Sequence, residues 1–225
     1  MPFKIIAHPE ENIIVLKNLA RFHFSPVNLC LDLKRKVICL LEQVFPEYET
    51  LFSDVFGVTS KQLLLSFNIP PPPPEDFVEI STTKLTNFLH KASRGKLGRE
   101  KTQSIKSAAE QSIGISFALN SFSFQIKQLV EQIDFTEKQI AALDKEFFKL
   151  FSATNSAVIT TITEISSVLG SAIVGEIGDI SRFQLAPKLV AYAGLDASVK
   201  QSDDFARKYK RNPKANLLLG FLFDS

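Results

Sequence analysis

The chain has 225 residues, 45% of them hydrophobic, which is enough for a packed core in one large or two small domains. A net charge of +2 by itself excludes no class of partner, but two cysteines, Cys30 and Cys39, are too few for a secreted disulfide framework and indicate reduced thiols in a cytoplasmic protein. We expect no signal peptide, and Glu164 and Glu176 argue against a membrane span at residues 157–178.

The charges are unevenly distributed along the chain. Residues 84–106 carry seven bases against Glu100 alone, a local charge of +6, and residues 188–214 carry seven bases against three acids, a local charge of +4. The rest of the chain therefore carries −8. Two basic windows of this kind predict a polyanionic partner, although solvated helix faces and turns would also explain them.

The first third of the chain is expected to be helical. A helix is predicted from Glu10 toward Phe22, interrupted by Pro26, because proline lacks an amide hydrogen and clashes with the preceding turn. A second helix is predicted to begin there, with Ser25 as its N-cap, and to stop before Pro46.

Five consecutive prolines fall within residues 69–77 and predict an extended, exposed polyproline segment. We expect a linker between helical parts, with a docking site for a proline-binding module as the alternative. After it, Ser81 is predicted to cap a short helix, and Gly95 and Gly98 to bracket a turn rich in basic residues.

A heptad pattern runs through residues 105–150. Twelve of its fourteen core positions are apolar, Ser112 and Thr136 being the exceptions, and no proline interrupts it. A seam this long and narrow needs a partner helix, so the pattern predicts a long helix in a coiled coil between chains or in a long hairpin.

Small and β-branched residues with glycines follow residue 155. They predict two helices around a tight turn at residues 164–167, the second ending near Gly178. A further helix is predicted over residues 187–192, ending at Gly194 in a left-handed C-cap.

Two helices around a tight turn are typical of a helix-hairpin-helix, whose turn amides bind a DNA phosphate without reading the bases. In this chain Glu164, Ile165 and Ser166 occupy the turn in place of the expected glycines. A glutamate facing a phosphate would repel it, so the residues alone argue against specific phosphate binding by this turn.

Residues 159–205, ITTITEISSVLGSAIVGEIGDISRFQLAPKLVAYAGLDASVKQSDDF, resemble the carboxy-terminal domain of the DEDD-type insertion-sequence transposases, the group related to the Piv DNA invertase. The features that carry the resemblance are, in order, the hairpin, EIGDISRF, a helix begun by proline, YAGLD and QS. Residues 19–57 and 91–114 also resemble the middle of such proteins.

The resemblance implies a mainly α fold in sequential segments. They are a helical remnant that follows a RuvC-like catalytic core (1–68), a proline-rich linker (69–80), a basic segment and coiled-coil linker (81–152), an incomplete carboxy-terminal transposase domain with a helix-hairpin-helix-like hairpin (153–206), and a divergent basic and apolar tail (207–225).

Members of this family move insertion sequences by DNA recombination, and some are guided by a structured RNA. The resemblance implies four acidic residues that bind a divalent metal such as Mg²⁺, and a serine nucleophile. Neither is identified here, because the acids would precede residue 1 and the segment after Phe205 has no SKRG-like serine. We therefore expect a truncated, catalytically incomplete transposase without catalytic or metal-binding residues of its own.

The expected partners are DNA, a structured guide RNA as in some family members, and further copies of the chain through the coiled coil. The alternative function is a non-catalytic coiled-coil module that binds DNA and inhibits or assists a full-length transposase. A separate enzyme is the weakest reading, because His8, His23 and His90 are isolated. The residues predicted to bind nucleic acid are Arg94, Lys96, Arg99, Lys101, Lys106, Lys188, Lys200, Arg207, Lys208, Lys210 and Arg211.

Overall fold

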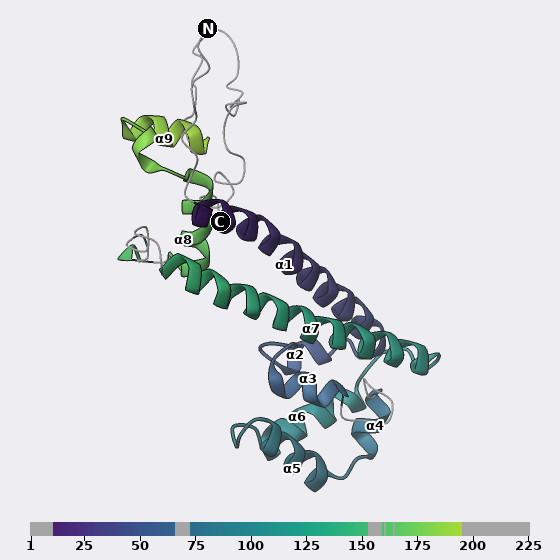
Figure 1. Ribbon diagram of the computed structural model, residues 1–225. Helices are drawn as coiled ribbons and strands as arrows, with labels where there is room; N and C mark the ends of the chain where they lie inside the picture. Colours follow the sequence, from purple (N-terminus) through teal and green to yellow (C-terminus); the bar gives the residue numbers. More distant parts are fainter. Residues whose placement is uncertain (1–10, 66–72, 153–158, 160, 164, 195–225) are drawn as a thin grey trace, which may run out of the picture. The chain divides into compact units, whose positions relative to one another are not determined.

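The computed structural model describes residues 11–65, 73–152, 159, 161–163 and 165–194 (Figure 1). These residues form helices, turns and loops without any β-strand, so the mainly α prediction is confirmed. The chain divides into two compact units, unit 1 (Met1–Ser25 and Ile140–Ser225) and unit 2 (Pro26–Gln139). Two long helices, α1 (Glu11–Val44) and α7 (Leu119–Ser152), contribute residues to both units.

The contact units join segments that are distant in the sequence, whereas the family resemblance suggested segments in sequential order. The contacts report which segments pack together in space, whereas the resemblance concerns the order of segments along the sequence. The assignment of sequential family segments stays a prediction.

Unit 1 packs the start of α1 and the end of α7 against α8 (Ser167–Ile177). The 3-10 helix η2 (Ile180–Arg182) then leads to α9 (Ala186–Ala193), whose Ala193 is buried with Ile173. The close packing of α8 depends on Gly175, because a Cβ there would lie 2.8 Å from the Lys17 backbone nitrogen. The buried core of this unit consists of Leu16, Ala20, Phe147, Phe151, Ala172 and Val174.

The described residues of unit 2 form five shorter helices besides its parts of α1 and α7. They are α2 (Tyr48–Leu51), α3 (Val58–Leu65), α4 (Pro74–Glu79), α5 (Thr82–Ala92) and α6 (Arg99–Glu110). Tyr48 is almost completely buried and bonds through its hydroxyl to Ser60, and burial raises the pKa of its phenol. The other large, fully buried side chains of unit 2 include Phe45, Leu63, Leu64, Phe77, Leu85, Leu89 and Ile105.

The heptad positions of α7 are buried or half-buried, and α1 of the same chain lies against them. In unit 1, His23 of α1 is 3.0 Å from the Asp144 carboxylate of α7 and meets the ring of Phe147 edge-on. In unit 2, the Lys34 ammonium of α1 is 2.8 Å from the Glu137 carboxylate of α7. A helix of the same chain, though not the neighbouring one in sequence, thus covers the seam. A homo-oligomer stays a prediction, but the seam no longer provides the reason for it.

The predicted interruption at Pro26 is wrong. Helix α1 continues through this position, Pro26 is buried in its interior, and Ser25 is no N-cap. An interior proline costs about 3 kcal/mol in an isolated helix. Tertiary burial offsets this cost, because α1 buries Leu16 and Ala20 before the proline and Cys30 and Leu33 after it.

The heptad helix is also shorter than the pattern predicts, because α6 ends at Glu110 and α7 begins at Leu119. The chain between them turns to the end of α1, where the Ile115 amide donates to the Gln43 carbonyl over 2.9 Å. Gly114 permits this approach, since a Cβ there would overlap the Val44 carbonyl oxygen. A periodic pattern cannot reveal such a long-range backbone pairing.

The polyproline prediction is wrong at the end of its segment, while residues 69–72 lie outside the described part of the chain. Pro74 begins α4, Pro73 precedes it as the N-cap, and Phe77 is fully buried. Proline is favoured at the first helical position, because its missing amide hydrogen would have no partner there. Part of the predicted linker is therefore folded into unit 2.

Candidate nucleic-acid interface

The basic turn (residues 93–99) connects α5 to α6 and presents three of the predicted nucleic-acid-binding residues to solvent. Arg94, Lys96 and Arg99 are all exposed. Arg94 takes a left-handed conformation with φ of 55°, and Gly95 follows with φ of 85°. The sequence places these bases close together, and the structure leaves their charged groups accessible.

Hydrogen bonds within the basic turn, and between the two helices that it connects, hold it in place. The Ser93 hydroxyl accepts from the Leu97 amide over 2.8 Å, and the Gly95 amide donates to the His90 carbonyl over 2.7 Å. Behind the turn, the hydroxyls of Thr86 and Thr102 are 2.9 Å apart and join α5 to α6. The predicted cap of α5 is confirmed, because the Ser81 hydroxyl accepts from the Lys84 amide.

Two other predicted residues of this window, Lys101 and Lys106, are engaged within unit 2. The Lys101 ammonium donates to the Leu51 carbonyl and lies 5.0 Å from the centre of the Phe52 ring, and burial lowers its pKa. The Lys106 ammonium donates to the Val78 carbonyl over 2.8 Å. A phosphate would have to compete with these carbonyls for both side chains.

The second basic window lies mostly outside the described residues. Lys188 is exposed on α9, with its ammonium 3.1 Å from the Gln184 side-chain oxygen. The structure describes none of Lys200, Arg207, Lys208, Lys210 and Arg211.

The second helix of the predicted hairpin is confirmed as α8. The Ser166 hydroxyl accepts from the Leu169 amide over 3.2 Å, and the helix ends at Gly178 with φ of 66°. Most of the first hairpin helix and Glu164 lie outside the described residues, and the described residues 161–163 are not α-helical. The predicted left-handed cap of α9 is confirmed at Gly194, with φ of 78°.

A buried carboxylate connects the end of α8 to α1, a role that no sequence pattern predicts. Glu176 is 1% exposed. Its two carboxylate oxygens accept hydrogen bonds from the Arg21 guanidinium over 2.7 and 3.2 Å, and the Lys17 ammonium lies 3.3 Å away. Buried charges require such partners, because desolvation strongly penalises an unpaired ion.

Arg182, at the end of η2, was also missed among the candidate residues. Its guanidinium carbon lies 4.7 Å from the ring centres of both Phe183 and Tyr192. Tyr192 in turn donates its hydroxyl hydrogen to the Glu176 carbonyl over 3.1 Å. The RF pair in the sequence suggests a basic and an aromatic residue together, but only the fold brings Tyr192 to them.

The segment that holds α8, η2 and α9 also carries the similarity to known proteins. Residues 156–219 match the model of the IS116/IS110/IS902 transposase family. This match supports an insertion-sequence transposase function. No curated protein and no solved structure gave a match to the chain.

The described residues offer no ligand cluster for the Mg²⁺ that the family resemblance implies. No group of three or more histidine, cysteine, aspartate or glutamate side chains gathers among them. The carboxylates of Asp134 and Glu137 both bind the Lys61 ammonium, over 2.6 and 2.9 Å. Burial alone would raise the pKa of Glu137, but hydrogen bonds from Lys34 and Lys61 outweigh it and lower the pKa.

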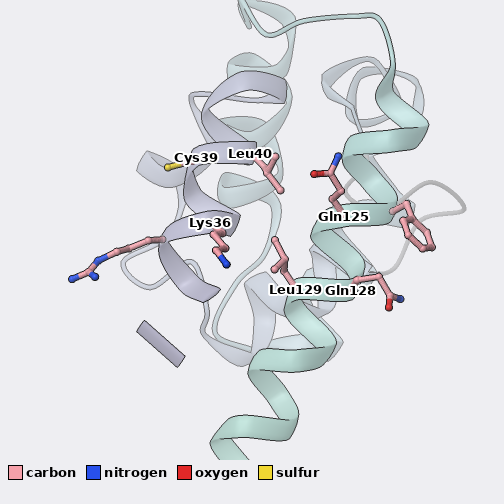
Figure 2. A pocket seen from close by; sticks show the side chains of 8 residues that line it. Lys36, Cys39, Leu40, Gln125, Gln128 and Leu129 are labelled. Carbon is pink, nitrogen blue, oxygen red and sulfur yellow. The ribbon is translucent and has the colours of Figure 1, made fainter. Parts of the chain in front are cut away.

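A pocket of about 530 Å³ lies between α1 and α7 in unit 2 of this candidate transposase (Figure 2). Leu40 and Leu129 point toward each other from the two helices, and Lys36 and Gln125 border the space between them. The lining contains Cys39 but no histidine or carboxylate. The pocket is therefore an apolar hollow without an acid–base pair.

Within the described ranges, no helix is both long enough and apolar enough to cross a membrane.

Proposed function

We propose that this chain serves an insertion-sequence transposase by binding DNA, with the basic turn as a contact to the phosphate backbone. The observation that carries the proposal is the exposure of Arg94, Lys96 and Arg99 on a turn fixed by hydrogen bonds. A fixed turn lowers the entropy lost when its side chains bind. The family match at residues 156–219 supplies the reason to expect DNA as the polyanion.

Contacts of this kind give affinity without reading the sequence. Arginine and lysine side chains that neutralise phosphates release condensed counterions, so the binding constant falls with salt concentration. Each phosphate contact to duplex DNA contributes about 0.9 to the slope of the logarithmic plot. The salt dependence of binding therefore counts the contacts that the basic turn makes.

The test replaces the three bases of the turn together, as Arg94→Gln, Lys96→Gln and Arg99→Gln. We expect the salt slope for a short DNA duplex to fall by up to about 2.7, measured by fluorescence anisotropy between low and moderate salt. Glutamine retains most of the side-chain length. Because one non-glycine residue replaces another, the substitution at Arg94 does not change the backbone preference at this left-handed position.

A matched control variant removes the same charge elsewhere, through Lys127→Gln, Lys138→Gln and Lys145→Gln. These three lysines are exposed on α7. The control variant should retain the wild-type slope if the basic turn binds phosphates directly. Equal losses in both variants would mean that net charge, and not the turn, controls binding.

The proposed partners beyond DNA are a guide RNA and a full-length transposase. If the chain binds a guide RNA through the basic turn, that structured RNA should compete with DNA in the same assay. A module that inhibits or assists a full-length transposase would copurify with that enzyme. We consider this second function less well supported, because α1 already covers the seam of α7 that would pair with a partner helix.

A further inference from the structure

We infer that Arg182 is a second phosphate contact, on a different unit from the basic turn. This inference rests on the proposed function, which supplies DNA as the source of the phosphate. Three properties of the guanidinium suit it to this role: the rings that hold it, its accessible hydrogen-bond donors and the charges around it.

Two aromatic rings restrict the guanidinium of Arg182. The ring centres of Phe183 and Tyr192 are 5.3 Å apart, and the guanidinium carbon is 4.7 Å from each of them. A cation at this distance is attracted to the faces of the rings. Binding therefore costs less side-chain entropy than it would for a freely moving arginine.

The aromatic platform is itself fixed to the core of unit 1. Tyr192 is joined to the end of α8 by its hydrogen bond to the Glu176 carbonyl. The carboxylate of the same Glu176 is held by Arg21 and Lys17 of α1. Arg182, close to both rings, consequently occupies a defined place on the surface, although its own backbone belongs to a short 3-10 helix.

The hydrogen-bond donors of Arg182 remain available. Its side chain is exposed, and no described group of the chain accepts a hydrogen bond from the guanidinium. The guanidinium carries its N–H donors in one planar fork, and the exposed fork of Arg182 can donate to an anion from solvent. Such a planar fork fits two phosphate oxygens at once, which a lysine ammonium cannot do.

Asp179 and Glu176, the acids of this segment, do not accept hydrogen bonds from the Arg182 guanidinium. Asp179 accepts from the Ser181 amide over 2.8 Å and from the Ser181 hydroxyl over 2.7 Å, and these bonds lower its pKa. Its negative charge attracts Arg182 and would weaken, without blocking, the approach of an anion. The charge of Glu176 is already matched by Arg21 and Lys17.

The experiment compares Arg182→Gln and Arg182→Lys with the wild-type chain on the same short DNA duplex. We expect Arg182→Gln to lower the salt slope by about 0.9, as for one lost phosphate contact. Arg182→Lys keeps the charge but loses the planar fork of donors, so it should keep most of the slope and bind more weakly. Arg35→Gln is the matched control, because Arg35 is exposed on α1 and pairs with Asp32.

Each outcome bears on a separate claim. A wild-type slope in Arg182→Gln, with DNA binding intact, overturns the role of Arg182 and leaves the basic turn unaffected. Absence of DNA binding by the wild-type chain overturns both proposals. Thermal unfolding of each variant shows whether its structure is retained. If Arg182→Gln is unfolded, the affinity of Arg182→Lys tests the proposal instead. An affinity equal to that of the wild-type chain would then contradict a bidentate contact.

Discussion

Glu176 shows how one buried side chain can hold a surface segment in place. Its carboxylate is removed from water, and the cost of that removal is offset by bonds to Arg21 and Lys17. Its carbonyl receives the hydroxyl of Tyr192, which supports Arg182. The residue thus connects α1 to the segment that resembles the transposase family.

Replacing Arg21 with methionine should expose the dependence of unit 1 on this pair. Methionine keeps the apolar stem but leaves the Glu176 carboxylate with Lys17 alone. We expect a loss of about 2 kcal/mol in the free energy of unfolding, measured in urea, which is less than for a fully buried pair because Arg21 is half exposed.

The double variant Arg21→Met with Glu176→Gln provides the control. Removing the charge on both sides should restore part of the lost stability, because no uncompensated carboxylate remains buried. If Arg21→Met is as stable as the wild-type chain, the pair contributes nothing and Glu176 is held by its other contacts.

At the scale of elements, the close contact between α8 and α1 depends on a glycine, because any larger residue there would crowd the backbone of α1. An added Cβ at Gly175 would lie 2.8 Å from the Lys17 backbone nitrogen and Cα, which cannot move without shifting α1. An added Cβ at Gly170 would meet the side chains of Ile159 and Phe151 at 3.0 Å, and side-chain atoms can rotate away.

These two glycines make a matched pair on one helix. Alanine gains helix propensity of about 1 kcal/mol over glycine at either position. We expect Gly170→Ala to be close to neutral, and Gly175→Ala to lose about 1–3 kcal/mol despite that gain. Chemical denaturation measures both, and equal effects would show that α8 can move away from α1.

The sequence predicted those elements whose signals are local. Ser81 caps the helix that follows it, α8 ends near Gly178 as predicted, and Gly194 ends α9 in the predicted conformation. Prediction from the sequence failed where a contact between distant residues determines the local structure. Pro26 is tolerated because α1 packs on both sides of it, and Gly114 is in a loop because the chain pairs with the end of α1.

The candidate nucleic-acid interface likewise contains features that the sequence predicts and features that depend on distant contacts. The clustering of Arg94, Lys96 and Arg99 can be read directly from their spacing, and the structure leaves all three exposed. The engagement of Lys101 with the Leu51 carbonyl could not be predicted, because it joins residues fifty positions apart. Arg182 escaped notice because its ring partner Tyr192 comes from the next helix.

For the whole molecule, the question is how far a disturbance in one unit reaches the other. Each unit has buried residues of its own, and the core cluster of Leu16, Phe147 and Val174 lies within unit 1. The polypeptide nevertheless runs through both units in α1 and α7. Proteins tend to open locally in compact cooperative units, so one part of a long helix can open together with the unit it packs in while the rest stays closed.

Gly175→Ala gives a test by hydrogen exchange, because it disturbs unit 1 at a single point. We expect faster exchange of the amides of α8 and of α1 near Lys17, with little change in α5 and α6, whose buried residues Leu85, Leu89 and Ile105 belong to unit 2. Gly170→Ala, with the same change in composition, should leave both regions close to wild type. An equal increase of exchange in α5, α6 and α8 would instead mean that the two units open together, with α1 and α7 transmitting the loss of stability between them.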